Sequence, residues 1–190
     1  MTETPEELHA RALAAGLVRP SVEEWDTFPF EGELRVRELL PPLEQEAPRH
    51  GVGGIGCRRC ESGDADAIWS DERWILSPLD RPSGLPVVVL LQPRAHHDLH
   101  DLPPDLSAEL GPLIQRVEAA VRSVGEIGRV HVCRWGDGSE HLHFWFMARP
   151  ARLPQTIGSF AAIWDDILPP TPEPIWQANI AAVVAALDGD

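Results

Sequence analysis

The chain has 190 residues, 43% of them hydrophobic, and a formal net charge of −14 at pH 7. Its length fits one domain with terminal additions, and its apolar content is enough for a packed core, which argues against global disorder. The acidic balance argues against nucleic acid as a partner, because binding a phosphate backbone requires a basic surface. All 16 basic residues are arginine, so Schiff-base lysine chemistry and the lysine of a P-loop are excluded.

Residues 1–50 form an acidic, proline-containing lead. It begins with a predicted amphipathic helix in which Thr4 is the N-cap, Pro5 the first helical residue and Glu7 the partner in a capping box. Residues 25–43 predict a strand or a short helix. There is no apolar core of a signal peptide, and no run approaches the roughly 18 apolar residues of a membrane span. With three cysteines, this predicts a protein of the reducing cytoplasm with no membrane partner.

The middle of the chain alternates between strand and helix patterns. The final 40 residues predict two further helices, the first capped by Ser159 and stopped by Pro169 and Pro170. In chain order, the predicted elements are a hairpin at 67–80, a strand at 85–97 ended by Pro93, a helix at 103–125 closed by Gly125, two strands at 128–135 and 140–150 joined by the turn Gly-Asp-Gly-Ser, and helices at 160–168 and 172–189.

This order predicts an α+β fold, an antiparallel β-sheet with flanking helices. We expect an N-terminal helical and extended lead at 1–50, an α+β domain at 51–153 and a C-terminal helical extension at 154–190 that packs on the domain. In the last helix, the residues expected to face inward are Ile175, Ile180, Val183, Val184 and Leu187.

Two histidines lie two residues apart in the predicted strand 140–150. Because a strand alternates its faces with period two, His141 and His143 are expected on one face, in a row continued by Trp145 and Met147. The other face then holds the core residues Leu142, Phe144 and Phe146. A single histidine here would be interpreted as a core imidazole bonded to a backbone carbonyl. A same-face pair favours a functional role, because two adjacent imidazoles are not both protonated at low cost.

A C-x₂-C pair, Cys57 and Cys60, precedes two groups of histidines, one after the strand 85–97 and one in the strand 140–150. Zinc prefers four nitrogen and sulfur donors in a tetrahedron, and two histidines from neighbouring strands would complete the pair. The alternatives are two ordinary thiols or a redox pair. A redox pair requires its first cysteine at a helix N-terminus, and residues 61–70 predict a loop and strand, so we favour zinc.

The order of these motifs resembles the histidine triad superfamily over residues 55–150. "EHLHFWFMARP" resembles its alternating-histidine strand, and "PVVVLLQPRAHHDLHDL" resembles its Pro-x-x-His segment. With "CRRC" upstream, the chain is similar to the zinc-containing histidine triad proteins and their galactose-1-phosphate uridylyltransferase relatives. The resemblance implies a closed structural zinc, with His97 as the alternative to one of its ligands. The implied ligands are Cys57, Cys60, His96 and His141.

The resemblance also implies an activity on a nucleotide phosphoester or phosphoanhydride, as a nucleotidyl transferase or hydrolase. His143 would be the nucleophile, beside His141, and would form a covalent nucleotidyl-histidine. Trp145 stands where the family has its third histidine, so a nucleotide-binding module without turnover is the alternative. Members of this family often form homodimers, which makes a second copy an expected partner.

The turn between the last two predicted strands supplies further candidates for substrate binding. Backbone N–H groups of Gly138 and Ser139, the Ser139 hydroxyl and Arg134 can cradle phosphate oxygens. Asp137 stands where hydrolases of the family usually have glutamine. The other interpretation is an ordinary turn beside a surface arginine. The predicted substrate-binding residues are Arg134, Asp137, Gly138, Ser139 and Trp145.

Overall fold

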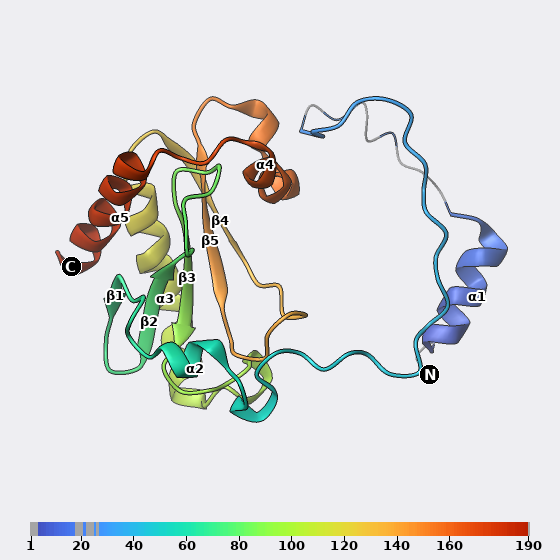
Figure 1. Cartoon of the computed structure of the whole chain (residues 1–190), viewed down its shortest axis with the longest axis horizontal. Coiled ribbons are helices and arrows are strands. Elements are labelled where there is room, and N and C mark those ends of the chain that lie inside the picture. The colour runs from blue at the N-terminus through green and yellow to red at the C-terminus, as the bar shows by residue number, and fades with distance from the viewer. Residues whose placement is uncertain (1–3, 18–20, 22–24, 26, 190) are drawn as a thin grey trace.

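The computed structural model describes residues 4–17, 21, 25 and 27–189 (Figure 1). The first helix, α1 (Pro5–Ala15), has the predicted capping box: the Thr4 hydroxyl accepts from the Glu7 amide, and the Glu7 carboxylate accepts from the Thr4 amide. None of the residues of α1 is buried. Across the described residues, no helix is both long enough and apolar enough to cross a bilayer.

Residues 31–48 stand apart from the sheet before the chain reaches α2 (Figure 1). The prediction of a strand or short helix at 25–43 is wrong for its described residues, which are irregular. Pro41 and Pro42 lack the amide hydrogen that a helix or a sheet ladder requires. The lead contacts the body of the protein where Phe28 packs edgewise on Phe160, with ring centroids 5.4 Å apart.

The sheet has five antiparallel strands in the order β1-β2-β3-β5-β4. Their bounds are β1 (Trp69–Ser70), β2 (Trp74–Pro78), β3 (Val88–Pro93), β4 (Ile127–Cys133) and β5 (Phe144–Pro150). The predicted hairpin is confirmed by the pairing of Trp69 with Leu76, and β3 ends at Pro93 as predicted. The predicted fold class, an antiparallel sheet with flanking helices, is confirmed.

One face of the sheet carries the main core, under α3 (Pro104–Arg122) and α5 (Glu173–Asp188), which lie side by side in Figure 1. Of the predicted inward residues of α5, Ile180, Val183 and Leu187 are buried and Val184 is half-buried. Ile175 is 53% exposed, so its prediction is wrong. Trp176 takes that place in the core, because α5 begins at Glu173 and turns Trp176 toward the sheet.

The opposite face of the sheet is covered only in part, by α4 (Ala161–Ile167). Ala162 packs there against a small cluster of Leu85, Val88 and Met147. The predicted cap of this helix is wrong: Phe160 is the N-cap residue, and no side chain caps the helix. The remaining short helices are η2 (Val52–Gly54), α2 (Arg58–Ser62), η3 (Leu99–Asp101), η4 (Pro154–Thr156) and η5 (Gly158–Phe160).

The connection between β4 and β5 is a ten-residue loop, 134–143, and not the predicted tight hairpin. Its backbone groups bond to other parts of the chain in place of a ladder: the Leu142 amide donates to the His97 carbonyl at 2.7 Å, and the Glu140 amide donates to the His50 carbonyl at 3.0 Å. His141 and His143 therefore lie in this loop, immediately before β5, and the prediction that they are strand residues is wrong.

Candidate metal site and active-site cavity

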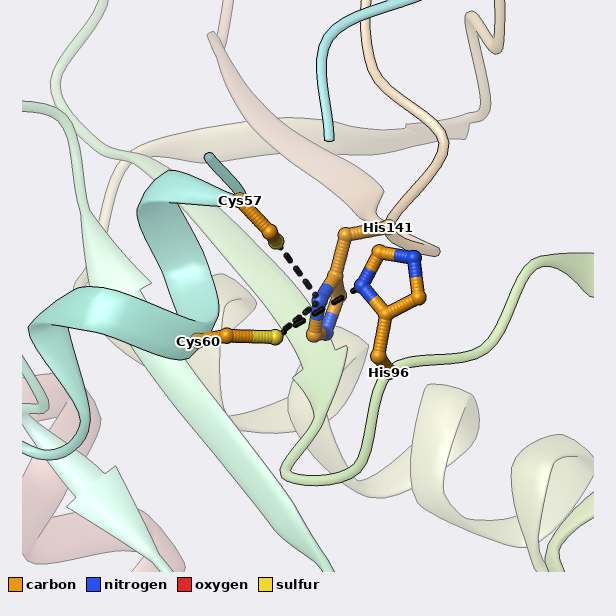
Figure 2. Close-up of side chains that lie close together, drawn as sticks. All are labelled: Cys57, Cys60, His96 and His141. Carbon is orange, nitrogen blue, oxygen red and sulfur yellow. Dashed lines mark hydrogen bonds between the residues drawn. The ribbon is translucent and has the colours of Figure 1, made fainter. Parts of the chain in front are cut away.

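Two cysteines and two histidines converge where α2 meets the loops that flank β3 and β5 (Figure 2). The Cys57 sulfur lies 3.4 Å from Nδ1 of His141, and the Cys60 sulfur lies 3.6 Å from the same nitrogen and 3.5 Å from Nδ1 of His96. All four ligand atoms lie within 4.8 Å of one another. The structure thus brings together the four residues predicted as metal ligands.

These separations fit a tetrahedral metal ion. Bonds of about 2.3 Å to sulfur and 2.0–2.1 Å to nitrogen, at the tetrahedral angle, place sulfur and nitrogen about 3.6 Å apart. The observed sulfur–nitrogen distances are 3.4–3.6 Å. Two thiolates with two imidazoles are also a donor set that suits zinc.

Hydrogen bonds fix which imidazole nitrogen faces the cluster. Nε2 of His141 lies 2.9 Å from the Pro93 carbonyl, and Nε2 of His96 lies 3.1 Å from the Glu140 carboxylate. Because both partners can only accept, each Nε2 carries the hydrogen and each Nδ1 presents its lone pair to the sulfurs. His97 lies elsewhere, with its Nδ1 4.0 Å from Asp101, so the choice between His96 and His97 falls on His96.

The electrostatics of the cluster differ between its members. Burial lowers the pKa of His141, which keeps this imidazole neutral as a metal ligand must be. Burial and the adjacent Cys57 raise the pKa of the Cys60 thiol to about 11. Metal uptake must therefore displace a proton from Cys60.

Cys57 is the N-cap residue of α2, where a loop and strand were predicted to follow. The loop and the strand β1 do follow, at 63–70, but the prediction missed α2 (Arg58–Ser62) itself, since a five-residue helix with little apolar periodicity gives a weak sequence signal. The argument against a redox pair that rested on the absence of a helix therefore fails. A metal site is favoured over a redox pair because two imidazole nitrogens lie 3.4 and 3.5 Å from the sulfurs, the separation expected between two ligands of one metal ion.

A cavity of 680 Å³ opens beside this cluster, on the face of the sheet that α4 leaves uncovered. Ser77, Leu90 and Gln92 form its floor, and they alternate along β2 and β3 with residues of the main core. His143 and Trp145 line the same cavity, with ring centroids 6.3 Å apart. His143 and Trp145 therefore lie on the same face of the sheet, as predicted, and both face this cavity.

A backbone carbonyl orients His143. Nδ1 of His143 lies 2.8 Å from the carbonyl oxygen of His141, so Nδ1 is the donor and Nε2 of the neutral ring keeps its lone pair. His141 therefore bears on both sites at once: its side chain belongs to the metal cluster, and its carbonyl sets the tautomer of the neighbouring imidazole.

The predicted substrate-binding residues fall into two groups. Gly138, Ser139 and Trp145 line the cavity with His143. Arg134 and Asp137 line a separate depression of 440 Å³, in which Arg134 forms an ion pair with Asp98. The structure does not bring these two residues to the cavity of His143.

Most of the residues that line the cavity were not predicted from the sequence, and Trp135 and Asp80 are two of them. Trp135 is 47% exposed and lies 5.8 Å from Trp145 between ring centroids. Asp80 lines the cavity in an ion pair with Arg58, at 2.7 Å. Both follow the end of a strand, β4 and β2 respectively, and a large aromatic residue next to a Gly-Asp-Gly turn was the available signal for Trp135.

Asp98 is expected to contribute to stability in a pH-dependent way. Burial raises the pKa of its carboxyl group, but hydrogen bonds from Arg49, the Leu99 amide and Arg134 outweigh burial and bring the pKa to about 2. In the unfolded chain the pKa of this carboxyl group is near 4. Because folding lowers it, Asp98 stabilises the fold at pH values above about 4, and this stabilisation is lost as pH falls from about 4 to 2. Since the side chain is only 6% exposed, the effect is about 2 kcal/mol.

We therefore expect Asp98→Asn to lower the free energy of unfolding by about 2 kcal/mol at pH 7 and to flatten its dependence on pH between about 4 and 2. Urea unfolding across this pH range measures both effects. Asp166→Asn, in an exposed carboxylate of α4, is the matched control and should change neither. Equal pH profiles for wild type and Asp98→Asn would contradict the assignment.

Comparison with known proteins comes from solved structures, since no family model and no curated protein matches the sequence. A Zn-bound histidine triad family protein from Mycobacterium smegmatis is 26% identical, with a TM-score of 0.51, over 71% of this chain and 97% of that one. A histidine triad protein from Sinorhizobium meliloti 1021 is 17% identical, with a TM-score of 0.53, over 67% of this chain and 94% of its own. One from Bradyrhizobium japonicum is 18% identical, with a TM-score of 0.52, over 65% and 92% of the two chains.

The five-stranded antiparallel sheet with its flanking helices is thus the α+β histidine triad fold. Together with the Cys-x₂-Cys, Pro-x-x-His and His-x-His motifs, this likeness places the chain in the histidine triad superfamily, as its sequence predicts.

Proposed function

We propose that this protein is a nucleotidyl transferase or hydrolase that acts on a nucleotide phosphoester or phosphoanhydride through a covalent nucleotidyl-histidine at His143. The observation that carries the proposal is the hydrogen bond of 2.8 Å from Nδ1 of His143 to the His141 carbonyl. It leaves Nε2 with a lone pair in a cavity of 680 Å³, which is the state a nucleophilic imidazole requires.

In the proposed reaction, Nε2 of His143 attacks the α-phosphorus and an N–P bond forms. The P–O bond to the leaving group (the P–N bond in a phosphoramidate) breaks, and its electron pair departs with the leaving group. An acceptor, water or a second nucleophile, then attacks the same phosphorus and releases the histidine. Backbone N–H groups of Gly138 and Ser139 and the Ser139 hydroxyl are the proposed ligands of the phosphate oxygens, since both residues line this cavity. The ion pair with Asp98 does not support the same role for Arg134.

We propose zinc as the metal of the Cys57, Cys60, His96 and His141 cluster. With four protein ligands such a site is closed, so the metal would brace the fold and supply no step of the reaction. Its effect on catalysis would pass through His141, whose imidazole it would hold and whose carbonyl orients His143. The zinc named for the Mycobacterium smegmatis protein supports this choice.

A nucleotide-binding module without turnover is the second candidate. Trp145 favours it, because the indole donates one N–H and cannot carry a proton between groups. In both candidates the ligand is a nucleotide-containing small molecule. The homodimer and the cytoplasmic location stay predictions from the sequence.

Replacing the nucleophile tests the proposal. Wild type and His143→Ala would each be incubated with nucleoside phosphoramidates, dinucleoside polyphosphates and nucleotide sugars, and intact mass would be followed under conditions that preserve an acid-labile adduct. We expect a nucleotide-sized adduct in wild type only, and a fall in turnover of at least about 10³-fold in the variant. His9→Ala, on α1 and away from the sheet, is the control.

An adduct that persists in His143→Ala would contradict the proposed mechanism. Absence of both adduct and product, with a rise of the melting temperature in the presence of nucleotide, would support the binding module instead.

A further inference from the structure

We infer that Glu140 is a positioning residue for the metal site, and that Arg49 of the N-terminal lead holds Glu140 in place. Glu140 is not among the four ligands, but its carboxylate contacts the second ring nitrogen of one of them, His96. The inference rests on the zinc site proposed above and concerns metal binding alone, so it does not depend on the reaction at His143.

The two oxygens of the Glu140 carboxylate have different partners. Oε2 accepts from Nε2 of His96 at 3.1 Å and from the Gly53 amide at 2.6 Å, and Oε1 lies 3.4 Å from the Arg49 guanidinium. The side chains of Glu140 and His96 are each 20% exposed. A carboxylate on the outer nitrogen fixes the ring orientation of a metal-bound histidine and raises its basicity. Glu140 is in the place to do this for Nδ1 of His96.

Arg49 connects the two loops that carry the histidine ligands. One terminal nitrogen donates to Asp98 at 2.7 Å and to the Gly136 carbonyl at 3.1 Å, and the other faces Glu140. Asp98 follows His96 by two residues, and Glu140 immediately precedes the other ligand, His141. A backbone hydrogen bond of 2.7 Å from the Leu142 amide to the His97 carbonyl joins these two loops, and the contacts of Arg49 add a second, side-chain link between them.

This assignment makes the lead a part of the metal site, although Arg49 precedes the predicted boundary of the α+β domain at residue 51. An exposed ion pair alone would matter little, because such pairs typically contribute less than about 1 kcal/mol. The Glu140 carboxylate is more than a partner in such an ion pair, since one of its oxygens accepts from both the Gly53 amide and the imidazole of the ligand His96.

Zinc affinity measured by chelator competition, on the full-length protein without nucleotide, tests the inference. We expect Glu140→Ala to weaken zinc binding by about 10–100-fold, the usual effect of removing an outer hydrogen-bond partner of a metal ligand. Glu140→Gln should recover most of the affinity, since its amide oxygen can still accept from His96. Glu118→Ala, which removes a carboxylate paired with Arg122 on α3, is the matched control and should bind as wild type does.

Two further measurements separate positioning from a general loss of structure. The absorption spectrum of the cobalt-substituted protein reports ligand geometry, and it should change in Glu140→Ala while the melting temperature of the chelated, metal-free variant stays near that of wild type. Arg49→Ala should weaken zinc binding less in the Glu140→Ala background than in the wild-type background, because its contact with Glu140 is already absent there and only its contacts with Asp98 and Gly136 remain to be lost.

Zinc affinity of Glu140→Ala within twofold of wild type would overturn the inference, and so would Glu140→Gln that binds no better than Glu140→Ala. A wild-type protein that takes up no zinc would overturn it as well. Loss of the adduct chemistry at His143 would leave all of these measurements unchanged, so failure of the proposed reaction is distinguishable from failure of this inference.

Discussion

Cys57→Ser is expected to abolish tight zinc binding and to lower the melting temperature by about 8–16 °C. Cys57 is 2% exposed, and its sulfur lies 3.4 Å from Nδ1 of His141. A ligand present at a thousand times its dissociation constant stabilises a fold by about 4 kcal/mol, and each kcal/mol shifts the melting temperature by roughly 2–4 °C in a chain of this size. Tight zinc binding is lost because serine is not a thiolate donor, so only three of the four ligands remain.

Zinc content per chain and thermal unfolding, each with and without a chelator, measure this effect. Cys133→Ser is the control, because Cys133 lies on β4 outside the cluster. Zinc affinity of the wild type should also fall as pH is lowered, since the thiol of Cys60, with a pKa near 11 in the absence of metal, must lose its proton to bind. One zinc per chain and an unchanged melting temperature in Cys57→Ser would contradict the assignment.

Local patterns in the sequence predicted most of the sheet and helices, because these elements are specified by neighbouring residues. The continuous apolar run that forms β3 and the 3.6-residue pattern of α3 are examples. The metal ligands were also predictable, since a cysteine pair, a Pro-x-x-His segment and a His-x-His segment each carry a local signature. The resemblance to the histidine triad superfamily then indicated that these three segments bind one metal ion together.

Long-range contacts account for the features that the sequence did not predict. His141 and His143 were assigned to a strand because alternation suggests a ladder, whereas the loop residues beside them bond to His50 and His97, far along the chain. Arg134 was a candidate phosphate ligand because arginine beside a turn suggests one. Its buried partner Asp98, 36 residues away, decides its position, and nothing near residue 134 indicates that pairing.

The contrast between local patterns and long-range contacts also explains why the sequence predicts the lead as an addition to the α+β domain. Its sequence predicts the helix that forms α1 and a strand or short helix at 25–43, but residues 27–48 contain neither helix nor strand. Arg49 at its end nevertheless contacts both loops of the metal cluster. A single arginine with two long-range carboxylate partners has no periodic signature, so its role becomes visible only when the loops are placed in space.

Trp145→His is expected to shorten the lifetime of the nucleotidyl-histidine by about 10²-fold. Trp145 is the next residue of the row after His143 and lines the same cavity, with ring centroids 6.3 Å apart. Hydrolysis of the adduct requires water to attack phosphorus and pass a proton to a base as the N–P bond breaks. Indole cannot accept that proton and imidazole can. A positioned acid–base group typically contributes 10²–10⁴-fold, and we expect the lower end because a smaller ring replaces a tryptophan.

The measurement follows decay of the adduct by intact mass after excess nucleotide is removed, in wild type, Trp145→His and Trp145→Phe. The phenylalanine variant keeps an aromatic ring and has no proton carrier, so its adduct should persist as long as in wild type. Equal lifetimes in all three folded proteins would contradict the idea that proton transfer at residue 145 limits hydrolysis. A faster decay in Trp145→His alone would show that this cavity lacks only the third histidine to act as a hydrolase, and would favour transfer to a second nucleophile as the reaction of the wild-type protein.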